Sequence, residues 1–223
     1  MREIILDTET TGLDPSAGHR VVEIGCVEVF QGIPTGATFQ TYVNPERDMP
    51  DEAFQVHGLS REFLAKQPTF AEIAQDFLDF IGGATLVIHN AAFDISFLNA
   101  ELDRLGLPML KFERTVDTIA IAKRRFPGAQ VSLDALCRRF EIDSSARTKH
   151  GALLDAELLA DVYLELVGGR QRHLEFATTD RAAARGSARR KSLSPRPHAP
   201  SEAELAAHAQ LLARLNDPIW LRT

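Results

Sequence analysis

The chain has 223 residues, a formal net charge of −6 at pH 7, 44% hydrophobic residues and 25% charged residues. This composition is ordinary for a globular protein, so collagenous, coiled-coil and wholly disordered classes are excluded. No apolar run approaches the ~20 residues of a membrane-spanning helix. A predicted strand begins at Glu3, so we expect no secretory signal. Cys26 and Cys137 lie in apolar stretches without CxxC spacing, which argues against disulfides or a cysteine zinc site and favours the cytoplasm.

The charge is unevenly distributed along the chain. Residues 1–168 hold 15 Lys and Arg against 26 Asp and Glu, whereas residues 169–200 hold 8 against 2. Tight, non-specific DNA binding needs clustered Lys and Arg to neutralise phosphates, so an acidic body argues against it. The charge remains compatible with a nucleic-acid enzyme that carries its positive charge as bound metal.

The hydrophobic pattern predicts a set of strands followed by alternating strands and helices. Strands are expected at 3–7, 20–30 and 36–43, with a Gly/Pro turn at 32–36 that suggests an antiparallel meander. Further along, the pattern predicts helices near 69–81, 91–105, 131–140 and 151–167, a strand at 84–89, and a short strand running into a helix at 115–125. This order favours an α/β domain with a mixed sheet flanked by helices.

The C-terminal part differs in composition. Residues 169–200 are rich in Ala, Arg, Ser, Gly and Pro, which predicts a flexible basic linker. A capping box, Ser201 with Glu204, then opens a short amphipathic helix, and the chain ends near an Ile-Trp-Leu run. This segment has no core of its own, so its apolar face needs a partner. We therefore expect a domain at 1–168, a linker at 169–200 and a docking segment at 201–223.

Two carboxylates mark the end of the first strand. Asp7 and Glu9 are two residues apart, so the strand period places both side chains on one face. Adjacent carboxylates repel, and a metal cation is the simplest way to keep both ionised. Alone, this spacing is more often the start of a solvated loop.

Two further aspartates stand at the head of apolar helical stripes. Asp94 is followed at helical spacing by Phe97, Leu98 and Leu102, and Asp155 is followed in the same way. The alternative is that each aspartate only interacts favourably with the positive end of the dipole of its helix. Because burying an unpaired charge is costly, both aspartates nevertheless favour a shared partner. Four carboxylates at one edge of the sheet would select a hard cation such as Mg²⁺ or Mn²⁺.

His150 precedes Asp155 by five residues. On a continuous helix the two side chains would point in different directions, so we expect His150 on the loop before the helix. A lone loop histidine is usually a surface residue. Beside a carboxylate cluster it is a candidate general base that activates water.

Three ordered motifs resemble those of the DEDDh 3′–5′ exonucleases. They are Asp7-Thr-Glu-Thr-Thr-Gly12, His89-Asn-Ala-Ala-Phe-Asp94 and His150-Gly-Ala-Leu-Leu-Asp155, and the resemblance covers residues 1–168. It implies a ribonuclease H-like fold with a mixed five-stranded sheet. It also implies phosphodiester hydrolysis with two divalent metal ions, Mg²⁺ or Mn²⁺.

The same resemblance assigns roles to the catalytic residues. Asp7 would bridge both metals, Glu9 and Asp155 would complete the metal that holds the water, and Asp94 would help to hold the second. His150 would deprotonate the attacking water. The resemblance further implies substrate contacts by Thr10, Thr11, Glu52, Val56, His57 and Phe93. The alternative for Phe93 is a core residue, and the alternative for His57 is a loop histidine.

Within that superfamily, the chain is most similar to the proofreading subunits of bacterial DNA polymerase III. Residues 171–176 contain Gln171, Leu174 and Phe176 in a spacing that resembles a sliding-clamp-binding peptide. The segment 201–223 resembles the region that binds the polymerase (alpha) subunit, with Leu205, Leu212 and Trp220 as contacts. A tether of this kind raises the local concentration of the exonuclease at a primer end.

The resemblance therefore predicts a metal-dependent 3′–5′ exonuclease that removes mispaired nucleotides from single-stranded or frayed DNA 3′ ends at the bacterial replisome. One alternative is a stand-alone exonuclease that trims RNA or oligonucleotide 3′ ends, although such an enzyme needs no docking tail. Another is a non-catalytic scaffold, although all five catalytic positions are filled.

Overall fold

The computed structural model describes residues 1–145, 147, 149–168 and 199–214. The chain divides into two compact units, Met1–Leu174 and Glu175–Thr223. Among the described helices, none is both long and apolar enough to cross a membrane.

A mixed five-stranded sheet forms the centre of the first unit, with strand order β3-β2-β1-β4-β5. The central strand β1 pairs antiparallel with β2 and parallel with β4, and β4 pairs parallel with β5. The strands are β1 (Arg2–Thr10), β2 (Val21–Phe30), β3 (Ile33–Tyr42), β4 (Thr85–Ile88) and β5 (Thr115–Asp117). The predicted α/β class with a mixed five-stranded sheet is thus confirmed.

Seven helices accompany this sheet in the described part of the first unit. They are α1 (Asp51–His57), α2 (Arg61–Leu64), α3 (Phe70–Ile81), α4 (Ala91–Arg104), α5 (Thr118–Arg125), α6 (Leu133–Arg139) and α7 (Ala152–Leu166). Short 3₁₀ turns lie at Pro15–Ala17 and Phe112–Arg114. A capping box of Thr69 and Glu72 opens α3, which is why this helix begins close to its predicted start.

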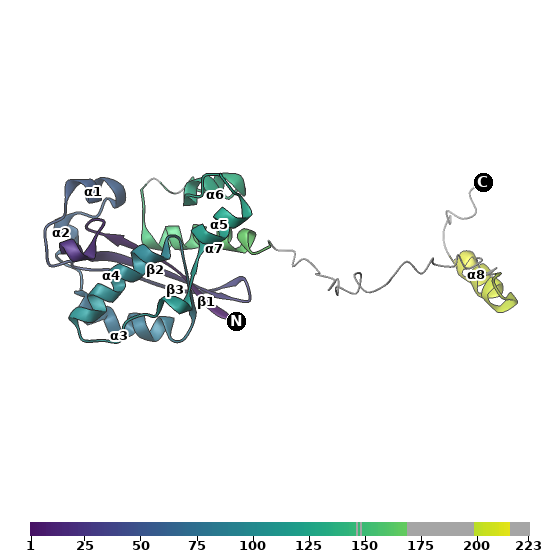
Figure 1. Cartoon of the computed structure of the whole chain (residues 1–223). Coiled ribbons are helices and arrows are strands. Elements are labelled where there is room, and N and C mark those ends of the chain that lie inside the picture. Colours follow the sequence, from purple (N-terminus) through teal and green to yellow (C-terminus); the bar gives the residue numbers. More distant parts are fainter. Residues whose placement is uncertain (146, 148, 169–198, 215–223) are drawn as a thin grey trace, which may run out of the picture. The chain divides into compact units, whose positions relative to one another are not determined.

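Helices cover both faces of the sheet (Figure 1). Because side chains alternate along a strand, Ile4 and Leu6 of β1 join a core with Phe77 of α3 and Leu98 of α4. Ile5 points to the opposite face, where it joins a second core built with residues of α5, α6 and α7. Alternate residues of β1 therefore pack against different layers of helices.

Three details differ from the sequence-based expectation. Strand β3 begins at Ile33, because a two-residue turn with positive φ at Gln31 and Gly32 lets Phe30 pair directly with Ile33. Helices α1 and α2 were not predicted, since neither is long enough to show helical periodicity. The first strand extends through Thr10, so Asp7 and Glu9 lie within it.

In the second unit, the structure describes helix α8 (Glu202–Arg214). Ser201 accepts from the Glu204 backbone, while the Glu204 carboxylate accepts from the Ser201 backbone, so the predicted capping box is present. Leu205 is 54% exposed and Leu212 is partly exposed. The predicted clamp-binding residues Gln171, Leu174 and Phe176, most of the predicted linker, and Trp220 lie outside the described residues.

Candidate active site

Alternation along β1 directs neighbouring residues to different helices. Asp7 and Glu9 share the face of Ile5, on which α7 packs, whereas Thr8 shares the face of α4. One strand therefore delivers two carboxylates to the α7 side and a hydroxyl donor to the α4 side.

Asp94 lies in the first turn of α4 and is buried. Its Oδ1 accepts hydrogen bonds from the Thr8 backbone N–H at 3.0 Å and from the Thr8 hydroxyl at 2.7 Å. These neutral donors fix the carboxylate against the central strand. Burial nevertheless raises the pKa of Asp94 to about 7.

Asp155 is held in place by the docking of α7 on β2. Gly25 of β2 faces the first turn of this helix so closely that an added Cβ would lie 2.2 Å from the Ala152 carbonyl carbon and the Leu153 nitrogen. Next to it, the Glu23 carboxylate accepts a hydrogen bond from the Ala152 N–H at 3.1 Å. Glu23 thus satisfies a backbone donor at the beginning of α7, whose own cap residue supplies no side-chain hydrogen bond.

The Asp155 carboxylate also forms an ion pair with Arg147. The Arg147 Nε donates to Asp155 Oδ1 at 2.5 Å, and its Nη2 donates to Asp155 Oδ2 at 2.6 Å. Arg147 also forms an ion pair with Asp134 of α6. Burial raises the pKa of Asp155, but a hydrogen bond from His150 and the hydrogen bonds and charge of Arg147 hold it below the usual value.

His150 lies directly before α7, on a loop as predicted, and its side chain is 48% exposed. Its Nδ1 lies 3.2 Å from Asp155 Oδ2 and 2.9 Å from Arg147 Nη2. A neutral imidazole that donates from Nδ1 to Asp155 can accept a proton on Nε2, which lies 3.4 Å from Arg147 Nη2.

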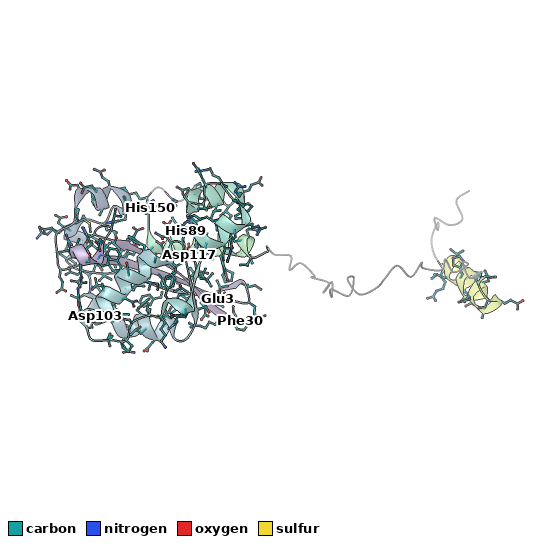
Figure 2. All side chains as sticks on the ribbon, viewed as in Figure 1. Glu3, Phe30, His89, Asp103, Asp117 and His150 are labelled. Atoms are coloured by element: carbon teal, nitrogen blue, oxygen red, sulfur yellow. The ribbon has the colours of Figure 1, made fainter. Side chains whose placement is uncertain are left out.

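One cavity of about 410 Å³ collects these side chains. Figure 2 labels His89 and His150, which both line it. Its lining includes the five predicted catalytic residues, Asp7, Glu9, Asp94, His150 and Asp155, together with Arg147, Asp134 and Phe93. A larger cavity of about 630 Å³ lies beside residues 44–49 and α2, outside the carboxylate cluster.

The carboxylates of this cavity resist ionisation together. Burial, and to a lesser extent the neighbouring acids, raise the pKa of Asp7 well above its usual value and that of Glu9 to about 8. Asp155 is the exception, because hydrogen bonds from His150 and Arg147, together with the charge of Arg147, lower its pKa. A bound cation would stabilise the ionised form of such a cluster.

The donor set fits a divalent metal. Glu9, His150 and Asp155 each offer a ligand atom within 4.8 Å of the others. Asp7 and Asp94 line the same cavity and add carboxylate oxygens. Oxygen-rich ligands favour hard divalent cations over soft ones.

The predicted substrate residues fall into two groups. Phe93 lines the cavity and also packs on Phe97, with ring centroids 4.9 Å apart. Its position is therefore compatible both with the predicted substrate contact and with the core alternative. Thr10 and Thr11 are buried, and their hydroxyls bond within the following turn, to the Gly12 carbonyl and to His19 respectively. The two threonines shape the end of β1 beside the cavity rather than line it.

Glu52, Val56 and His57 all lie on α1. Glu52 and Val56 are exposed, and the Val56 carbonyl accepts a hydrogen bond from the His150 N–H at 3.3 Å. His57 is the last residue of α1, not a loop residue, and it is buried, with Nδ1 accepting from the Leu59 N–H at 3.0 Å. Burial lowers the pKa of His57 to about 4.

Sequence reasoning missed three residues that organise the site, namely Arg147, Asp134 and Glu23. Arg147 lies in a polar stretch and Asp134 is an acid in the first turn of a helix, and many surface residues share these features. Glu23 gave a usable signal, since it is a charged residue within the apolar strand Val21–Phe30. A buried acid in a strand needs a donor, and here the donors are Gln40 and the Ala152 N–H.

Comparison with known proteins shows the family. A family model described as "Exonuclease" matches residues 4–163. DNA polymerase III subunit epsilon of Rickettsia conorii is 48% identical over 96% of this chain and 96% of its own length. The subunit of the same name from Escherichia coli is 51% identical over 79% of this chain and 75% of its own length.

Solved structures agree with this assignment. Exonuclease X in complex with 5′ overhanging duplex DNA is 26% identical, with a TM-score of 0.57, and the match covers 74% of this chain and 90% of that one. The nuclease domain of 3′hExo, a DEDDh family member bound to rAMP, shares the fold at 21% identity and a TM-score of 0.65, over 77% of this chain and 94% of that one. The chain therefore belongs to the exonuclease family and, within it, to the epsilon subunits of bacterial DNA polymerase III, the proofreading 3′–5′ exonucleases.

Proposed function

We propose that this chain removes mispaired nucleotides from DNA 3′ ends by phosphodiester hydrolysis at the cavity between β1, α4 and α7. The observation that carries the proposal is the convergence of Asp7, Glu9, Asp94, His150 and Asp155 on that one cavity. Four acids and one histidine match the needs of metal-assisted hydrolysis at neutral pH.

Asp7, Glu9, Asp94 and Asp155 would hold two divalent cations, Mg²⁺ or Mn²⁺. When bound, such ions lower the pKa of water and neutralise charge on the leaving oxygen. His150 takes the proton of the attacking water on Nε2, while Asp155 orients the ring through Nδ1. The exposed position of His150 allows it to pass that proton on to solvent.

The surroundings of the cavity favour a single-stranded end. Phe93 offers an aromatic face at the cavity for a base or sugar, and Glu52 and Val56 of the neighbouring α1 would contact the terminal nucleotide together with His57. A mispaired terminal nucleotide costs less to unstack than a paired one. Selection for mismatches would follow from this difference in cost.

We also propose the partners. The relatives are named as subunits of DNA polymerase III, so residues 201–223 would bind the polymerase (alpha) subunit through Leu205, Leu212 and Trp220. Residues 171–176 would bind the sliding clamp, and 169–200 would act as the linker from the domain at 1–168. The exposed Leu205 on α8 is consistent with such docking. Assembly on a bacterial replicative polymerase would place the chain in the cytoplasm.

The test is a nuclease assay on labelled primers with paired or mismatched 3′ ends, with Mg²⁺, with EDTA, and with and without the polymerase subunit. We expect faster release of mismatched nucleotides that depends on Mg²⁺. The Asp7→Asn variant should lose at least roughly three orders of magnitude in rate, because Asp7 contributes to the whole metal site.

His150→Ala should lower the rate by about 10²–10⁴-fold at neutral pH. Deletion of 201–223 should leave hydrolysis of free single strands intact and remove polymerase binding in pull-down. A preference for RNA ends, with no polymerase binding by the full chain, would support the stand-alone alternative instead.

A further inference from the structure

Arg147 is the only Arg or Lys among the described residues that line the carboxylate cavity. Five acids line the same cavity, namely Asp7, Glu9, Asp94, Asp134 and Asp155. The Arg147 side chain is 9% exposed, so its charge lies inside the cavity wall and not in solvent. A guanidinium in this position is the resident counter-charge of the acids.

Arg147 uses the same atoms that a metal needs. Its fork engages both oxygens of Asp155, at 2.5 and 2.6 Å, in the bidentate arrangement typical of strong Arg–carboxylate pairs. Its Nη2 also lies 2.9 Å from His150 Nδ1. A divalent cation held by Asp155 would therefore compete with a positive charge that already engages both oxygens of that carboxylate.

Arg147 also pairs with a second carboxylate. Its Nη1 pairs with Asp134 on α6, whose side chain is 53% exposed and lies at the cavity wall. A guanidinium that released Asp155 but kept this pair would hold its charge at the mouth of the cavity, where Asp134 is exposed.

We propose that Arg147 is an internal counter-cation that competes with the divalent metal for Asp155 and, once displaced, remains at the cavity mouth through Asp134. This inference rests on the proposed metal site. It adds a residue that sets how tightly the site binds metal and that stabilises the metal-free protein. Arg147 acts on the reaction through Asp155 and His150, so it is a positioning residue.

The test measures metal binding directly, without substrate. Mn²⁺ is titrated into the full-length chain by isothermal calorimetry for the wild type and for Arg147→Met, Arg147→Lys and Arg138→Met. Arg138 is an exposed residue of α6 that does not line the cavity, so its variant controls for loss of one positive charge. Melting temperatures in EDTA report the metal-free state.

We expect Arg147→Met to bind Mn²⁺ roughly three- to tenfold more tightly than the wild type, since the competitor is gone. Arg147→Lys keeps the charge without the fork and should fall between the two. In EDTA, Arg147→Met should melt several degrees below Arg138→Met, because Asp155 then loses the guanidinium charge that offsets its own charge and those of Asp7 and Glu9.

An unchanged or weaker Mn²⁺ affinity in both Arg147 variants would overturn the inference while leaving the metal site intact. Absence of Mn²⁺ binding in the wild type would instead overturn the proposed metal site itself. Should Arg147→Met fail to fold in EDTA, the comparison of Arg147→Lys with the wild type decides the question.

Discussion

The two helices that bring aspartates into the cavity hold them in different ways. Asp94 on α4 accepts two hydrogen bonds from neutral donors of Thr8, which belongs to the central strand. Asp155 on α7 accepts two hydrogen bonds from the charged fork of Arg147. Both carboxylates are buried, yet the pKa of Asp94 is raised and that of Asp155 is lowered. The pKa of a buried acid therefore depends on its partners as well as on burial, and at Asp155 the hydrogen bonds from His150 and Arg147 outweigh the effect of burial.

The difference also separates rigid from adjustable support. Thr8 cannot move without the sheet, so the α4 side of the site is built into the fold. Arg147 is a long side chain on the loop before α7, so the α7 side is fixed through Gly25 and Glu23 and neutralised by a group that can leave. The α4 side fixes the position of the Asp94 carboxylate, and the α7 side controls whether the Asp155 carboxylate is available to a metal.

Among the tests that compare the two sides, the largest expected effect on kcat comes from breaking the α7 side at its backbone contact. In Gly25→Ala the new Cβ would meet the backbone of Ala152 and Leu153, so α7 must shift. We expect a loss of about 2–3 kcal/mol in the free energy of unfolding. A displacement of about 1 Å at Asp155 should cost roughly 100-fold in kcat. Urea unfolding and single-turnover hydrolysis measure the two effects.

Gly83→Ala is the matched control, because an added Cβ there meets no atom within 4 Å. It should keep the activity and stability of the wild type. Full activity in Gly25→Ala would show that α7 does not depend on this close contact.

A second test uses pH to compare the two sides without metal. Folded-state pKa values of about 8 for Glu9 and about 7 for Asp94 lie above the unfolded values, so the unfolded chain releases these protons first. In EDTA the free energy of unfolding should thus fall by several kcal/mol between pH 5 and 8. Asp155 acts in the opposite direction, since its lowered pKa stabilises the fold above its unfolded pKa and that stability is lost on acidification.

Melting curves at pH 5, 6.5 and 8 check this expectation. Saturating Mg²⁺ should abolish most of the fall, and Glu9→Gln should reduce it in EDTA. Stability that rises from pH 5 to 8 in EDTA would contradict the assigned pKa directions.

The smallest expected effect comes from the α4 side. Thr8→Val removes the hydroxyl that donates to Asp94 at 2.7 Å but keeps the shape of the side chain and the backbone donor. Loss of one hydrogen bond to a buried carboxylate should cost roughly 1–2 kcal/mol, equivalent to about five- to thirtyfold in kcat. Thr8→Ser restores the donor and should recover most of the rate. Equal rates for the Val and Ser variants would mean that the backbone N–H alone holds Asp94.

The sequence predicts the parts of this site that depend on periodicity. Asp7 and Glu9 follow from the two-residue repeat of β1, and Asp94 and Asp155 follow from the apolar stripes that they head. The predicted position of His150 before a helix follows from its spacing to Asp155. These features are local, so a single stretch of chain contains the information.

The remaining features depend on contacts between distant residues. Glu23 and Ala152 are 129 residues apart, so the cap of α7 is invisible to a local pattern. Helix α1 has seven residues, too few for an amphipathic repeat to appear. Arg147 gains its role from the two carboxylates it meets after folding, and its sequence neighbourhood resembles that of any surface arginine.

The central position of β1 has a further consequence for how the enzyme loses activity on heating. This strand is hydrogen-bonded on both sides, to β2 and β4, and its residues Ile4, Ile5 and Leu6 are fully buried. Amide hydrogens in such a strand exchange with solvent only when the whole domain opens. Because Asp7 and Glu9 lie on that same strand, fraying at the sheet edges leaves them in register, and inactivation on heating coincides with melting of the domain.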